Sequence, residues 1–224
     1  MSSATHAEHA EHHPFHAHHF ETLEQQQASA KLGMWLFIAQ EILFFSAVFL
    51  AYFVFRYWYP EGFLEAHYLL SIPMGATNTV VLLTSSLTMA LAVRAAQIGD
   101  QRQLKLQLIA TIALAGVFMV IKYFEYSEKV TKGLLPFEIG GTDYFTYQGL
   151  PEGGRLFFAL YFFMTGLHGL HIVIGIGILF WIYLRAAKGH FGPAYNAPVE
   201  NTGLYWHLVD LIWIFLFPLL YLVK

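Results

Sequence analysis

The 224-residue sequence contains no cysteine. Disulfide bonds, zinc–thiolate sites, iron–sulfur clusters and haem attached through a Cys-x-x-Cys-His motif are therefore excluded by chemistry. Any metal ion would need histidine and carboxylate ligands instead.

Charged residues are also scarce. They make up 12% of the chain against 57% hydrophobic residues, whereas a soluble domain of this size carries about 25% charged residues. We therefore predict an integral membrane protein. The 12 basic and 15 acidic residues form no basic stripe, so nucleic acid is not an expected partner.

Targeting signals are lacking as well. No cleavable signal peptide precedes the first apolar run, and the first thirty residues contain neither Lys nor Arg, which argues against a mitochondrial transit peptide. The bacterial inner membrane is the expected location.

Residues 1–30 form a histidine-rich tail. Imidazoles at this density can collect copper, nickel or zinc. The alternative, which we favour, is a solvated and disordered leader. Its histidines are His6, His9, His12, His13, His16, His18 and His19.

The remaining residues, 31–224, are predicted to form one all-α transmembrane domain. Each apolar run is long enough to cross a bilayer as a helix. The segment from Arg56 to Leu70, with interfacial aromatic residues and Pro60, is expected to be a loop. No site is expected in the long loop 129–154. The five predicted transmembrane helices cover about 32–55, 72–96, 106–126, 156–184 and 203–223.

The loop charges predict an orientation. The two short loops at 94–105 and 185–190 are basic, and the positive-inside rule weights short loops most. We expect the amino terminus inside and the carboxyl terminus outside.

Glu41 is the most unusual residue of the first apolar run. It lies about 14 Å in from Leu32, about half of a ~30 Å hydrocarbon layer. An ionisable group at that depth indicates function, although it could also serve only as a hydrogen-bonding group within a helix bundle. Because burial disfavours the charged form, we expect Glu41 to be protonated at pH 7 and bonded to an imidazole.

The fourth run offers two imidazoles, His168 and His171, on one helix face. They could be ligands, or could bond to a neighbouring helix. By helical rise, His171 lies closer in depth to Glu41 than His168 does, so His171 is the better predicted partner.

Two further polar pairs stand three residues apart. Lys122 and Glu125 are expected to pair near the membrane surface, as snorkelling side chains at a helix end. His207 and Asp210 are expected to bond to each other just inside the membrane.

Motifs from all five runs together resemble a known family. They are KLGMWLFIAQEILFF, the small-residue run around Asn78, YFEYSE, GLHGLHIVIG and YWHLVDLIWIFLF. Over about residues 31–221 they resemble subunit III of the haem-copper terminal oxidases, in particular of aa3-type cytochrome c oxidase.

The resemblance implies a subunit with no catalytic residue, redox centre or metal site of its own. Haem a and copper would lie in partner subunits. The chain would pack on subunit I, within a complex that includes subunit II, and would support its stability and proton supply. The family's carboxylate that corresponds to Glu41 is known for reacting with carbodiimide.

Many family members have two further helices before the acid-bearing one, and these form one wall of a lipid-filled cleft. Here a histidine-rich tail stands in that place, so the wall is expected to be absent or supplied by another subunit. Bound phospholipid is still expected, with Arg185 and Lys188 as phosphate partners.

Other functions remain open at this stage. The family also includes subunits of quinol oxidases and companions of nitric oxide reductases. Haem held by His168 or His171 together with His207 is conceivable. A small proton-coupled transporter or channel would use Glu41, His171, His207 and Asp210 as a relay, although no inverted repeat is visible.

Overall fold

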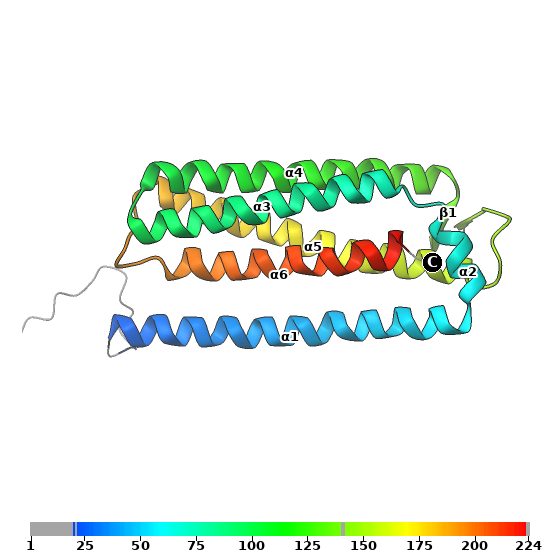
Figure 1. The fold of residues 1–224 in the computed structure, drawn as a ribbon, viewed down its shortest axis with the longest axis horizontal. Coiled ribbons are helices and arrows are strands. Elements are labelled where there is room, and N and C mark those ends of the chain that lie inside the picture. Colours follow the sequence, from blue (N-terminus) through cyan, green and yellow to red (C-terminus); the bar gives the residue numbers. More distant parts are fainter. Residues whose placement is uncertain (1–19, 21, 140–141, 223–224) are drawn as a thin grey trace, which may run out of the picture.

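The computed structural model describes residues 20, 22–139 and 142–222. Five long helices lie along one axis, and a short helix and a two-stranded hairpin lie at one end (Figure 1). The elements in chain order are α1 (Leu23–Trp58), α2 (Pro60–His67), α3 (Ile72–Ile98), α4 (Gln101–Thr131), β1 (Leu134–Ile139), β2 (Thr142–Phe145), α5 (Gly154–Ala187) and α6 (Ala197–Tyr221).

The five long helices are each long and apolar enough to cross a membrane. This confirms the predicted all-α bundle, with the hairpin as a small addition. Helices α3 to α6 pack together, and α1 lies beside α6 and α5. α1 exposes most of its apolar side chains, including Leu43 and Tyr57 at 73% and 83%.

Helix α1 begins well before the predicted position. Thr22 caps it, since its hydroxyl accepts a hydrogen bond from the Gln25 backbone N–H at 3.1 Å. The next residues, LEQQQASA, are polar but favour helix. The predicted boundary between tail and helix at residue 30 is therefore too late. The proposed roles of the histidines at 6–19 fall outside the described residues.

The predicted loop between the first two spans is wrong, because it contains α2. Pro60 is the first residue of this helix rather than a breaker, since proline needs no N–H donor partner at that position. Phe63 is fully buried and packs edge-on against Tyr52 and Phe157.

The loop 129–154 contains the antiparallel hairpin β1–β2, in which Leu134 pairs with Phe145. Arg155 anchors it through two hydrogen bonds to the Asp143 carboxylate, at 2.8 and 3.0 Å. The Phe145 backbone N–H and Arg155 together hold the pKa of Asp143 below its usual range.

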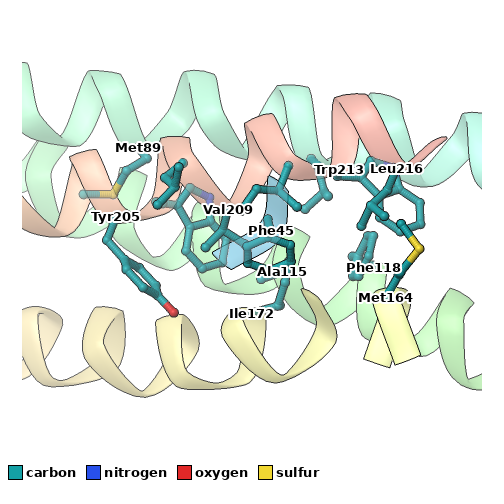
Figure 2. Packing of buried hydrophobic residues seen from close by; sticks show 14 of the residues in the cluster. Phe45, Met89, Ala115, Phe118, Met164, Ile172, Tyr205, Val209, Trp213 and Leu216 are labelled. Atoms are coloured by element: carbon teal, nitrogen blue, oxygen red, sulfur yellow. The ribbon is translucent and has the colours of Figure 1, made fainter. Parts of the chain in front are cut away.

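The core of the bundle is aromatic and aliphatic. Figure 2 shows Val209, Trp213 and Leu216 of α6 among side chains that include Phe118 and Met164. Phe118 and Trp213 meet edge to face, with ring centroids 4.9 Å apart.

Glycine sets the spacing of two helix pairs. A Cβ on Gly175 would lie 2.7 Å from the Trp206 ring, and one on Gly203 would lie 2.8 Å from Val93. These residues let α5 approach α6, and α6 approach α3, more closely than a side chain would allow.

Candidate functional site

Glu41 lies on α1, beside His171 of α5 and Tyr205 of α6. Its Oε2 is 3.3 Å from Nε2 of His171, and both side chains are largely buried, at 9% and 14% exposure. The other carboxyl oxygen accepts a long 3.4 Å hydrogen bond from Gln40. The structure therefore brings together the two residues that helix depth had paired.

The tautomer of His171 limits what this pair can do. Its Nδ1 lies 2.9 Å from the Leu167 carbonyl oxygen. A carbonyl only accepts, so Nδ1 carries a proton. Nε2 then faces Glu41 either as a lone pair or as a second N–H. A proton on Oε2 or on Nε2 would turn this 3.3 Å contact into a hydrogen bond.

A cavity of about 490 Å³ opens onto this pair. Met34, Phe37 and Ile174 contribute apolar walls, and Tyr205 and Asn201 contribute polar groups. Tyr205 donates to the His171 carbonyl oxygen at 2.9 Å. The cavity gives an apolar reagent a route to the Glu41 carboxyl group.

His168 does not share this site. Its ring is fully buried against Phe118 and Trp213, with centroids 5.5 and 5.2 Å away. Neither ring nitrogen has a hydrogen-bond partner among the described residues.

The predicted bond between His207 and Asp210 is wrong, because both side chains bond to α3 instead. His207 Nδ1 lies 2.7 Å from the Ser86 hydroxyl oxygen, and Asp210 Oδ2 accepts from Ser85 at 3.4 Å. Because α3 packs against α6, the hydroxyl groups of Ser85 and Ser86 lie within hydrogen-bonding distance of these two side chains.

Lys122 and Glu125 do pair, at 2.8 Å, but the snorkelling interpretation is wrong. Lys122 is 7% exposed and Glu125 fully buried. The ammonium also donates to the hydroxyl groups of Tyr161 and Tyr221, at 3.2 and 3.1 Å. Tyr221 in turn donates to the second Glu125 oxygen at 2.6 Å.

This Lys122 network satisfies all three ammonium donors inside the bundle. The faces of four rings lie within 5.1–5.8 Å of the nitrogen and add cation–π attraction. Sequence reasoning missed Tyr161 and Tyr221, which stand 39 and 99 residues from Lys122.

Arg185 and Lys188 lie at the end of α5. The Arg185 guanidinium stacks over Trp181 and Phe191 and donates to His190 at 3.4 Å. Lys188 is exposed. Both cations thus stand at the end of a span, where a lipid phosphate would lie.

Within the described residues, no group of three or more His, Asp or Glu side chains could hold a metal ion. The His171 ring is held by Leu167 and Glu41, and the His207 ring by Ser86. His168 lies against Phe118 and Trp213, whereas His207 lies against Ser86.

Comparison with known proteins gives a consistent result. The model of the family "Cytochrome c oxidase subunit III" matches residues 8–224. Cytochrome c oxidase subunit 3 of Loxodonta africana is 31% identical over 204 residues, which cover 87% of this chain and 70% of that protein. The protein of the same name from Marchantia polymorpha is 33% identical over 206 residues, with 87% and 69% covered.

A relative of another kind is the haem-copper oxidase subunit I+III of Aeropyrum pernix. It is 28% identical over 197 residues, which cover 85% of this chain and 22% of that protein.

The fold and its buried polar pairs define an integral membrane protein with several transmembrane helices. The chain belongs to the cytochrome c oxidase subunit III family and is a subunit III of a haem-copper oxidase. The resemblance read from the five motifs is confirmed, and the transporter and channel alternatives are not favoured.

Proposed function

We propose that this chain is the non-catalytic subunit III of a cytochrome c oxidase. It packs on subunit I and supports that subunit's stability and proton supply, while haem a and copper in partner subunits reduce O2. The family match over residues 8–224 carries the proposal. The relatives named above as subunit 3 belong to cytochrome c oxidases, which favours cytochrome c over quinol as the electron donor.

The supporting role agrees with how the polar side chains are used. Lys122 donates three hydrogen bonds, to Glu125, Tyr161 and Tyr221, and His171 has a neighbour at each ring nitrogen. Such groups hold helices together or hold a proton.

Subunit I is the proposed direct partner, because one relative carries the name of a combined subunit I+III. Subunit II and further subunits complete the proposed complex. The exposed apolar face of α1, with Leu32, Leu43 and Leu50, would lie against lipid or a neighbouring subunit. Arg185 and Lys188 are the proposed phospholipid contacts.

Removal of this chain tests the function. The remaining oxidase is expected to keep its haem spectrum and its initial rate of O2 reduction, and then to lose activity progressively over repeated turnovers. Spectra and oxygen-electrode traces of complexes with and without the chain measure this. Loss of the haem bands from a correctly assembled complex would instead assign a cofactor role to this chain.

The proposed location is the bacterial inner membrane, with the amino terminus inside. Because the chain lacks cysteine, single cysteines placed near Gly99 and near Thr142 can be labelled without background. An impermeant maleimide applied from outside is expected to label the cysteine near Thr142 and not the one near Gly99. Equal labelling of both from one side would contradict the topology.

A further inference from the structure

A second groove, which the proposed function does not use, lies at the end of the bundle where α6 begins. Its volume is about 440 Å³, and side chains of α1, α3 and α6 line it. At its mouth, Glu200 accepts hydrogen bonds from Lys31 at 3.0 Å and Gln97 at 2.7 Å. The imidazole of His207 lines the groove seven residues further along α6, about 10 Å deeper.

The Nδ1 edge of the His207 ring faces Ser86 of α3, inside the bundle. Its Nδ1 lies 2.7 Å from the Ser86 hydroxyl oxygen, and the adjacent residue, Ser85, donates to Asp210 Oδ2 at 3.4 Å. Among the described residues, Nε2 has no hydrogen-bond partner, and it belongs to the ring that lines the groove. The His207 ring and the Ser86 hydroxyl group therefore stand between the groove and the buried carboxyl group of Asp210.

Asp210 is 3% exposed, and one of its oxygens, Oδ1, is buried without a hydrogen-bond partner among the described residues. The other accepts from Ser85 at 3.4 Å. No cation in the described part of the chain lies at ion-pair distance from it. Of the two buried lysines of α4, Lys122 pairs with Glu125 and Lys129 lies 3.9 Å from Glu128. An isolated carboxylate in such a place is costly, so the group is most stable as a neutral acid.

We propose that Asp210 is a buried proton-binding site that exchanges protons with this groove through His207 and Ser86. In the loading step, His207 Nε2 takes a proton from groove water and Nδ1 releases its own to Ser86. The Ser86 hydroxyl proton passes to the Asp210 carboxylate. One proton moves from water to the acid, and the ring ends neutral with its proton on Nε2 while Ser86 keeps the proton that came from Nδ1. A tautomer change of the ring and a rotation of the hydroxyl group then restore the starting arrangement.

Infrared spectroscopy of the purified oxidase complex, transferred from H2O to D2O, tests the proposal. Asp210→Asn is expected to remove one carboxylic acid C=O band from the spectrum. In the unmodified complex that band shifts when its proton exchanges for deuterium. Ser86→Ala and His207→Gln are each expected to slow the shift by about tenfold or more, because each removes a member of the proton relay.

Thr84→Ala is the matched control. Thr84 lies on the exposed face of α3, and its hydroxyl group donates to the Val80 carbonyl oxygen at 2.8 Å. Its loss is expected to leave the exchange rate unchanged. The proposal is overturned if Asp210→Asn removes no acid band, or if either relay variant exchanges at the unmodified rate.

Discussion

Treatment of the purified oxidase with a hydrophobic carbodiimide is expected to modify Glu41. Glu41→Gln is expected to abolish this modification completely, with assembly intact and O2 reduction largely preserved. Carbodiimides react with protonated carboxyl groups in apolar surroundings. The largely buried Glu41 side chain faces a cavity of about 490 Å³ and lies 3.3 Å from Nε2 of His171. Mass spectrometry of the peptide that contains residue 41 measures the adduct.

Asp210→Asn is the matched control for Glu41→Gln. Asp210 is also a buried carboxyl group, but it does not line the cavity beside Glu41. This variant is expected to keep full labelling at Glu41. If Glu41→Gln instead stopped turnover in a fully assembled complex, Glu41 would belong to an essential proton route. The supporting role proposed for the chain would then be wrong.

Lys122→Met is expected to lower the free energy of unfolding by about 3–5 kcal/mol, because it leaves the Glu125 carboxylate buried without its cation. Glu125 is fully buried, and only the Tyr221 hydroxyl would still donate to it. The temperature at which this chain dissociates from the purified complex is expected to fall accordingly.

The double variant Lys122→Met and Glu125→Met is expected to recover most of the loss, since no unpaired charge then remains buried. The matched surface pair is Lys132 and Glu128, with side chains 46% and 36% exposed. Lys132→Met is expected to cost less than about 1 kcal/mol. If Lys122→Met cost no more than Lys132→Met, the Lys122 network would not stabilise the bundle.

The five spans could be predicted from the sequence because each is an apolar run of about twenty or more residues, which mean hydropathy detects directly. The ends of the spans were not. Residues 23–30 are polar helix formers capped by Thr22, and Pro60 begins a helix rather than ending one. Both helix ends depend on helix propensity and on capping residues, which mean hydropathy does not detect.

Part of the candidate site could be predicted from the number of residues between each side chain and the end of its helix. The contact between Glu41 and His171 could be predicted because helical rise sets the depth of each residue in a membrane of known thickness. The destination of Lys122 could not. Counting only apolar residues placed it near a helix end, whereas α4 continues to Thr131 and tyrosines from α5 and α6 enclose the ammonium.

The sequence by itself determined the membrane class, the five spans, the family, and which polar residues interrupt the apolar runs. Each of these rests on composition, periodicity or motif order, which are properties of the linear chain. Only the tertiary structure decided the partners of those polar residues. His207 and Asp210 are near neighbours on α6, yet they bond to Ser86 and Ser85, more than a hundred residues away. Inside a bilayer, where no water competes, a buried polar group bonds to whichever group the neighbouring helix presents, and helix packing alone determines which group that is.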